Sequence, residues 1–347
     1  MATDKISVGI LGLGRSGWGI HAKGLEDLPE QFTVAAVADP MPERQQEARE
    51  KFGCETYDTP EQLIAESDVE LVTIATPSHT HAALAQQALA AGKHVVVEKP
   101  MAGSVAEIDE LIAASEKSGT IITAFQNQRL DPSFLAVKDV FDSGRIGEPV
   151  LIRRTVHRFQ RRNDWQTLRG HGGGELPNTA LHFLDQLLTL VPVEMPVELL
   201  ADLRQLNSAG DAEDHVKLTI RPESGPVLDL ESSMVVAAPQ ESWFVVGTKG
   251  TISGTPGELT VKWTDLDALP DLEANPNTPE GRAYGNGETY EWQTETIDVP
   301  SPNQRTQGYY SKLYDTIRNG AELFVTPASV RRVAEVVDRA RAQSNFA

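Results

Sequence analysis

The amino-terminal part of the chain alternates short apolar runs with longer segments of helical pattern. The apolar runs, which predict buried strands, cover residues 6–11, 32–38, 71–75, 94–98 and 121–125. The helical segments between them include Glu43 to Lys51, Thr80 to Ala91 and Val105 to Lys117. Strands that alternate with helices are typical of a parallel, doubly wound sheet, whose functional residues gather at the carboxyl ends of the strands. We therefore predict an α/β domain over residues 1–125.

The pattern changes after residue 126. Helices are predicted at 132–143 and 177–191, and a closing helix runs from Pro327 to Gln343. Strand-like runs without intervening helices cover residues 149–159, 197–206, 215–221, 227–237, 242–247, 258–263 and 289–298. Repeated strands joined by short turns favour an open, mainly antiparallel sheet, so residues 126–347 are expected to form an α+β domain. Residues 265–288, rich in Pro, Gly, Asn and acids, are predicted to be an exposed excursion.

A glycine pattern follows the first apolar run, with Gly12, Gly14 and Gly17 ahead of a helical stretch. In a strand-to-helix turn the first glycine allows a tight bend, the second lets backbone approach a pyrophosphate, and the third lets helix and strand pack closely. Asp39 ends the next apolar run, 22 residues after Gly17, where an acid can bind the adenosine ribose. A glycine turn in another kind of α/β protein is the alternative. The full order of strand, glycines, helix, strand and acid favours a dinucleotide site.

Composition narrows the choice of partners. With 31 basic and 50 acidic residues the formal charge is −19, which argues against nucleic acid or an anionic membrane as a partner. The single cysteine, Cys54, allows no internal disulfide and fits a reducing cytoplasm. No apolar run approaches the ~20 residues of a membrane span, and strand one begins too early to leave room for a signal peptide. We expect a cytoplasmic enzyme that acts on a small molecule.

Lys99 is the first candidate for a reacting group. It follows the fourth apolar run in the segment His94-Val-Val-Val-Glu98-Lys99-Pro100. Partial burial at the end of such a strand disfavours the ammonium form, which would make this lysine a proton donor or a stabiliser of an alkoxide. A solvated lysine without a chemical role is the alternative.

The second candidate is His182, which follows a run of three glycines at 172–174. If Pro177 opens a helix, then Asn178, His182 and Asp185 are spaced i, i+4, i+7 and share one face. A histidine on such a face can take a proton from a hydroxyl group. An interior histidine on an amphipathic helix is the alternative.

Six ordered motifs show that the chain resembles the glucose–fructose oxidoreductase/inositol dehydrogenase (Gfo/Idh/MocA) family from Ile6 to near the C-terminus. The motifs are Gly12-x-Gly14-Arg15-x-Gly17, Ala75-Thr76-Pro77-Ser78-x-x-His81, Gly92-Lys-His-Val-x-x-Glu98-Lys99-Pro100, Asn127-x-Arg129-x-Asp131-Pro132, Gly172-Gly173-Gly174 with His182-x-x-Asp185, and Val246-Gly-Thr-Lys-Gly-Thr. The resemblance implies a Rossmann domain over residues 1–125 and a substrate-binding, oligomerisation domain over residues 126–347. It also implies homodimers or homotetramers.

The resemblance assigns roles to individual residues. Lys99 and His182 would line the pocket beside the nicotinamide, with Asn178 standing where an aspartate is frequent, which leaves its part in proton handling open. The residues expected to bind the cofactor are Gly12, Gly14, Arg15, Gly17, Asp39, Thr76, Pro77, Ser78, His81, Glu98, Lys99 and Asn127. No metal site is expected, because His79 and His81 have no third ligand that converges with them.

These observations predict an NAD(P)-dependent dehydrogenase or reductase for a secondary alcohol of a sugar, cyclitol or derivative. Two alternatives stay open: a glycosidase or lyase that retains its NAD, and a non-catalytic sugar or nucleotide sensor. The negative charge of Asp39 favours NAD over NADP, because it repels a 2′-phosphate. Arg15 and Arg44 could offset that repulsion, so NADP is not excluded.

Overall fold

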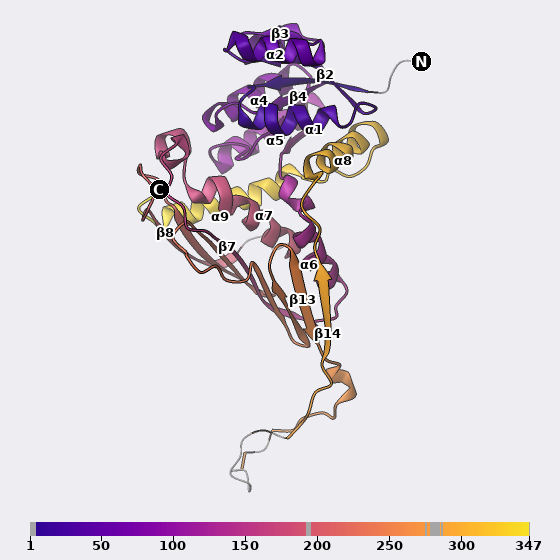
Figure 1. The fold of residues 1–347 in the computed structure, drawn as a ribbon, viewed down its shortest axis with the longest axis vertical. Coiled ribbons are helices and arrows are strands. Elements are labelled where there is room, and N and C mark those ends of the chain that lie inside the picture. The colour runs from indigo at the N-terminus through magenta and orange to yellow at the C-terminus, as the bar shows by residue number, and fades with distance from the viewer. Residues whose placement is uncertain (1–4, 192–195, 275, 278–284, 286, 347) are drawn as a thin grey trace.

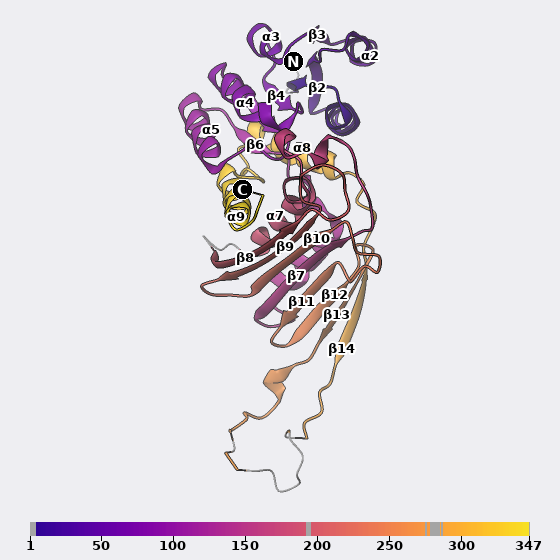
Figure 2. The ribbon, with the colours of Figure 1, turned by 90° about the vertical axis from the view of Figure 1, so that its left-hand side faces the viewer.

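The computed structural model describes the whole chain except residues 1–4, 192–195, 275, 278–284, 286 and 347. A helix-flanked sheet forms one end of the molecule, and a longer sheet lies below it (Figure 1). The described residues between the last two strands of the longer sheet extend away from the rest of the chain, as the pattern of residues 265–288 predicts (Figures 1 and 2).

The amino-terminal sheet has six strands in the order β3-β2-β1-β4-β5-β6, and all of its strand pairs are parallel. The strands are β1 (Ile6–Leu11), β2 (Phe32–Ala38), β3 (Glu55–Tyr57), β4 (Leu71–Ile74), β5 (His94–Val97) and β6 (Ile122–Ala124). The helices are α1 (Lys23–Glu26), α2 (Pro42–Phe52), α3 (Pro60–Glu66), α4 (His81–Ala90) and α5 (Val105–Ser118). The strand order reverses between β1 and β4, which places a ligand crevice at the carboxyl ends of the strands.

The second sheet has eight strands in the order β14-β13-β12-β11-β7-β10-β9-β8. Only β7 and β10 pair in parallel among its described pairs, so the mainly antiparallel sheet is confirmed. The strands are β7 (Pro149–His157), β8 (Pro196–Arg204), β9 (His215–Pro222), β10 (Val227–Ser233), β11 (Trp243–Gly247), β12 (Gly250–Gly254), β13 (Glu258–Trp263) and β14 (Gln293–Asp298). Helices α7 (Leu181–Leu190) and α9 (Pro327–Ala342) pack together on one face of this sheet (Figure 2), and α6 (Pro132–Asp142) precedes β7.

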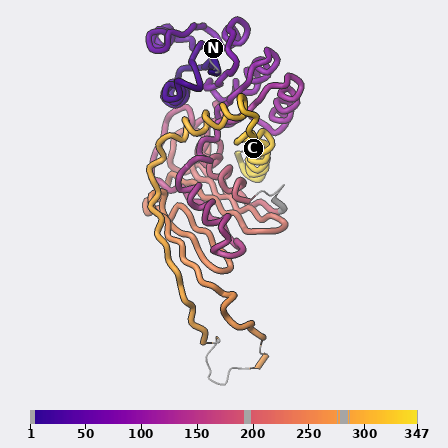
Figure 3. Tube along the Cα trace, turned by 90° about the vertical axis from the view of Figure 1, so that its right-hand side faces the viewer, coloured from indigo at the N-terminus to yellow at the C-terminus, as the bar shows by residue number. Residues whose placement is uncertain are grey.

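Helix α8 (Arg305–Asn319) returns from the second sheet to the amino-terminal domain (Figure 3). Tyr309 and Tyr310 on this helix are buried in the first hydrophobic core. The Tyr310 hydroxyl lies 3.1 Å from Thr73 Oγ1, and the Tyr309 hydroxyl donates to the Ala124 carbonyl at 2.9 Å. The two tyrosines therefore anchor the returning helix in the core of the amino-terminal domain.

The structure corrects the predicted helix at 177–191. Residues Leu176–Ala180 form a π-helical turn, and the α-helix α7 begins only at Leu181. The sequence also does not predict β3, α3, β12 or α8. The two strands are short, and α8 carries so many polar residues that its apolar periodicity is weak.

Candidate active site

The glycine loop has the shape that a dinucleotide pyrophosphate requires. Gly12 has a φ of 86°, and a Cβ added there would lie 2.9 Å from the Ala75 carbonyl oxygen. A Cβ added at Gly17 would lie 1.8 Å from the Gly12 carbonyl oxygen, so this contact needs glycine. A Cβ added at Gly14 meets nothing within 4 Å, which leaves open space beside the loop. The tight turn, the close packing and the open approach together fit a bound dinucleotide.

Asp39 lies at the end of β2, as predicted, and it is 2% exposed. Its Oδ2 accepts a hydrogen bond from the Leu13 N–H at 2.8 Å, and its Oδ1 accepts one from the Met41 N–H at 3.0 Å. Arg44 Nη1 also lies 3.2 Å from Oδ2, on a side chain that is 42% exposed. An oriented acid and an exposed cation therefore meet at this end of the crevice, where Arg15 is also exposed.

The loop after β4 carries Thr76, Pro77 and Ser78, and His81 holds it in place. The buried His81 ring lies between two carbonyl oxygens, with Nδ1 2.7 Å from Pro100 O and Nε2 2.9 Å from Thr76 O. Burial lowers the pKa of His81, although both carbonyl contacts oppose this shift. His81 thus ties the loop after β4 to the loop after β5, whereas Pro77 is exposed and Ser78 is half-buried.

Glu98 is bound into a polar network beneath the glycine loop. Its carboxylate accepts hydrogen bonds from the Ser16 hydroxyl and from the Lys99 N–H, and it lies 3.2 Å from His21 Nε2. Burial raises the pKa of Glu98, but its contacts with His21 and Ser16 outweigh burial and hold the value at about 2. The carboxylate is therefore charged under all ordinary conditions.

Lys99 reaches across from the amino-terminal domain to the π-helical turn. Its Nζ donates a hydrogen bond to the Asn178 carbonyl oxygen at 2.7 Å. Burial lowers the pKa of Lys99, and the charges of Glu98 and Glu175 oppose this effect. The structure thus brings Lys99 and residue 178 together, but through the backbone carbonyl and not through the Asn178 side chain.

The side chains of Asn178 and His182 make separate contacts. Asn178 Nδ2 donates to the Gly174 carbonyl at 2.8 Å, and its Oδ1 accepts from Gln166 Nε2 at 3.1 Å. His182 Nδ1 instead lies 3.1 Å from Gln126 Oε1. The predicted common face of Asn178 and His182 is therefore not a hydrogen-bonded pair in the described structure, because the π-helical turn changes the spacing between them.

His182 is half-buried, and its surroundings disfavour the charged ring. Burial, and then the charge of Lys99, lower the pKa of His182 to about 3. Gln126, the partner of this ring, is not among the residues that the sequence motifs predict for the site. Its position directly after the predicted strand at 121–125, where site residues gather, was the available signal.

Two further predicted residues lie close by. Asp185 forms a buried, bidentate ion pair with Arg129, with Nε–Oδ2 and Nη2–Oδ1 distances of 2.7 and 2.6 Å. It therefore joins α7 to the segment after β6, and in the described structure it forms no hydrogen bond with His182. Asn127 is half-buried and opens the 3₁₀ turn Asn127–Leu130 next to Gln126.

Among the described residues, no group of three or more His, Cys, Asp or Glu side chains is arranged so that it could hold a metal ion. No described helix has the length and apolarity needed to cross a membrane.

Comparison with known proteins identifies the family. The sequence matches the oxidoreductase family with an NAD-binding Rossmann fold over residues 6–126, and the Gfo/Idh/MocA C-terminal domain over residues 134–253. The chain belongs to the Gfo/Idh/MocA oxidoreductase family. This Gfo/Idh/MocA protein is an NAD(P)-dependent dehydrogenase or reductase.

Relatives of this Gfo/Idh/MocA protein include an uncharacterized oxidoreductase and two inositol dehydrogenases. Escherichia coli YdgJ, an uncharacterized oxidoreductase, is 31% identical over 72% of this chain and 71% of its own length. A myo-inositol 2-dehydrogenase of Thermotoga maritima is 30% identical over 74% and 78%, and the Bacillus subtilis scyllo-inositol 2-dehydrogenase (NADP(+)) IolW is 27% identical over 98% and 94%. The crystal structure of an NAD-binding protein from Listeria innocua superposes with a TM-score of 0.79 at 27% identity, over 97% of both chains.

Proposed function

We propose that this protein interconverts a secondary alcohol and a ketone on a cyclitol, a sugar or a derivative of one. The protonation state of the His182 ring is the observation that carries the proposal. Because an amide oxygen only accepts hydrogen bonds, the contact with Gln126 Oε1 supports a neutral ring that carries its proton on Nδ1. Nε2 then keeps its lone pair. It takes the hydroxyl proton during oxidation and returns it during reduction.

Lys99 stabilises the oxygen that loses or gains this proton. Its ammonium group has three donors, and the Asn178 carbonyl accepts one of them. The others are available to a substrate oxygen, where a positive charge favours the alkoxide. Because burial lowers the pKa of Lys99, the group also releases a proton more readily than an exposed lysine. We assign Asn178 to this site through the carbonyl that positions Lys99.

We assign cofactor binding to residues at the carboxyl ends of the parallel strands: Gly12, Gly14, Arg15, Gly17, Asp39, Thr76, Pro77, Ser78, His81, Glu98, Lys99 and Asn127. The nicotinamide supplies the hydride chemistry when bound. Among these residues, His81 and Glu98 act by fixing the loops, because their own polar atoms already have partners in the structure. Lys99 belongs to the set because it would lie beside the nicotinamide, where it acts on the substrate oxygen and contributes little to NAD affinity.

The names of two relatives support the substrate class, since both are inositol dehydrogenases. We further propose that residues 1–125 form the cofactor-binding domain and residues 126–347 the substrate-binding and oligomerisation domain. The protein would act as a cytoplasmic homodimer or homotetramer, and the single cysteine fits that reducing compartment.

A dehydrogenase assay across inositols, aldoses and uronates, with NAD and NADP in parallel, tests the proposal. We expect one class of polyol to produce the reduced cofactor, as followed by its absorbance. Product formation without any net change in cofactor absorbance, together with cofactor that survives gel filtration, would instead identify an NAD-retaining glycosidase or lyase. No turnover of any alcohol or of the matching ketones would also contradict the proposal.

A further inference from the structure

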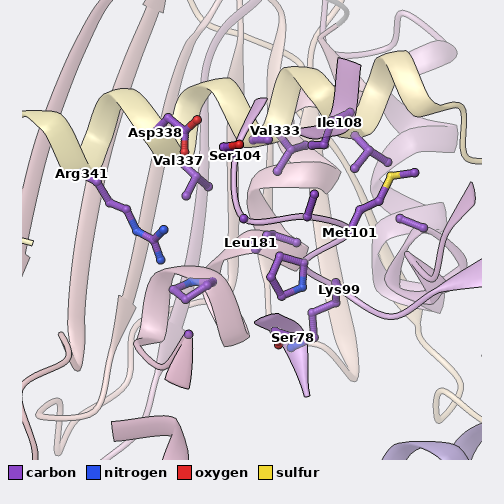
Figure 4. Close-up of a pocket in the computed structure, with 18 of the residues that line it drawn as sticks. Ser78, Lys99, Met101, Ser104, Ile108, Leu181, Val333, Val337, Asp338 and Arg341 are labelled. Atoms are coloured by element: carbon purple, nitrogen blue, oxygen red, sulfur yellow. The ribbon is translucent and has the colours of Figure 1, made fainter. Parts of the chain in front are cut away.

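A cavity of about 180 Å³ opens beside Lys99, between the amino-terminal domain and α9. Its walls come from the loop after β5, from α5, from the segment around Pro177 and from α9 (Figure 4). The cavity shares Ser78, Lys99 and Gln126, the partner of the His182 ring, with the proposed active site. Its lining includes neither His182 nor any glycine of the dinucleotide loop. The proposed reaction therefore uses one edge of this space and gives no role to the part that α5 and α9 line.

The cavity has a mostly aliphatic wall, formed by Met101, Ile108, Leu181, Val330, Val333 and Val337. Such a wall offers no hydrogen bonds, so the hydroxyl groups of a polyol would lose their partners there. A dry cavity of roughly 150 Å³ with a similar wall binds benzene in another protein. The cavity is thus large enough for a six-membered carbon ring or a short branched chain.

Arg341 supplies a charged group at one end of this cavity. Its half-buried guanidinium extends from α9, with Lys99 and Ser78 on the facing wall (Figure 4). Within the described part of the chain, this guanidinium forms no hydrogen bond or ion pair, although Glu213 lies within its electrostatic reach. Asp338 also lines the cavity, but its Oδ2 accepts a hydrogen bond from the Val105 N–H at 3.3 Å. A partly buried arginine without a partner favours an anion.

We propose that this cavity binds a small amphipathic monocarboxylate, with its carbon skeleton against Met101 and the valines of α9 and its carboxylate at Arg341. The site does not depend on the identity of the polyol. Because Lys99 forms part of the wall, a bound carboxylate also favours the charged form of this lysine. Occupancy of the cavity is therefore coupled to the group that stabilises the substrate oxygen.

Titration of the intact protein with benzoate, followed by NMR of methyl-labelled methionine, tests this site. The Met101→Leu variant identifies the Met101 signal, and benzamide serves as the uncharged probe of the same shape. We expect benzoate to shift the Met101 signal saturably, and to bind at least about tenfold more tightly than benzamide, as a charge-assisted hydrogen bond predicts.

Three variants separate the contributions of charge and space. Arg341→Gln should reduce benzoate binding to the level of benzamide. Arg331→Gln is the matched control, because Arg331 lies on the same helix but pairs with Asp109 outside the cavity, so benzoate binding should not change. Ala334→Leu adds side chain to the lining and should abolish the binding of both probes.

Three outcomes would overturn the proposal: no saturable shift at millimolar benzoate, unchanged benzoate affinity in Arg341→Gln, or an equal Met101 shift with myo-inositol. If Ala334→Leu does not fold, Arg341→Gln still decides the question, because its side chain is not part of the packed core. Binding and not turnover is measured, so the result is independent of the dehydrogenase assay.

Discussion

Two helices that border the cleft begin with a π-helical turn. The polar side chains at the two turns differ in how many of their atoms have hydrogen-bond partners. In the turn Gly17–Ala22, His21 is fully buried and both ring nitrogens have partners, Tyr310 Oη at 2.8 Å and Glu98 Oε1 at 3.2 Å. The turn Leu176–Ala180 lies beside Lys99, whose Nζ contacts one carbonyl oxygen. His182, just after that turn, forms a hydrogen bond through Nδ1 and none through Nε2 among the described residues.

Under the proposed function, this difference distinguishes a structural network on the cofactor side from a reacting group on the substrate side. On the proposed cofactor side, both nitrogens of the His21 ring and the Glu98 carboxylate have partners, so we expect this network to fix the shape of the glycine loop. On the substrate side, donors and a lone pair are left for a ligand, and π-helical turns are frequent at such functional positions. Substitutions on the cofactor side should therefore change cofactor affinity, and those on the substrate side should change the rate of the chemical step.

The largest effect is expected on the substrate side. Lys99→Ala and His182→Ala should each lower kcat by roughly 10²–10⁴, which is the usual contribution of a positioned proton-transfer group. NAD affinity should be largely unchanged, and steady-state kinetics with fluorescence titration measures both quantities. Lys117→Ala, at an exposed position on α5, is the control. Near-native turnover of Lys99→Ala would show that this lysine is only structural.

The next effect concerns the cofactor side. Gly14→Ala should weaken NAD binding by at least about tenfold, because the added methyl group occupies the space that a pyrophosphate needs. Its Tm should not change, because a Cβ at that position contacts nothing within 4 Å. Gly19→Ala is the matched control, since Gly19 has equally open surroundings outside the glycine pattern. Native NAD affinity in Gly14→Ala would contradict the assignment of the loop.

A smaller effect is expected at the adenosine end of the crevice. NAD should bind severalfold more tightly than NADP, because the oriented carboxylate of Asp39 repels a 2′-phosphate. Arg44→Ala should widen this preference, because Arg44 is the cation that offsets the charge of Asp39. Fluorescence titration with both cofactors measures the ratio. Tighter binding of NADP would refute the preference.

The smallest expected effect is a shift in pH dependence. In Asn178→Asp the new negative charge, one helical turn before His182, favours the imidazolium and raises its pKa from a starting value of about 3. The ring then stops acting as a base at a higher pH, so the acidic limb of kcat/KM for oxidation should move upward, by on the order of half a unit. The shift is small because the two side chains have separate partners. An unchanged limb with intact substrate binding would show that residue 178 does not influence this proton.

Local sequence patterns predict the glycine turn and the position of Asp39 at the end of β2. The three glycines, the apolar strand before them and Asp39 each have a backbone or charge requirement that short-range sequence expresses. The five predicted strands of the first sheet are confirmed for the same reason, since buried parallel strands are continuous apolar runs.

The substrate side could be predicted only in outline. Lys99 and His182 are visible as residues, but their contacts depend on how two distant segments meet. The Lys99–Asn178 contact joins residues 79 positions apart, and the His182–Gln126 contact joins residues 56 apart. The predicted i, i+4, i+7 face also requires an α-helix from residue 177, where the structure has a π-helical turn. Neither feature leaves a periodic signal in the sequence.

The most direct test of the account measures NAD affinity and kcat side by side in Lys99→Ala and Gly14→Ala. We predict opposite patterns. Lys99→Ala should keep NAD affinity within about threefold of the native protein and lose its turnover. Gly14→Ala should lose NAD affinity but recover most of its turnover at saturating cofactor. Parallel losses of affinity and turnover in both variants would contradict the division of the cleft into a cofactor scaffold and a proton-transfer site.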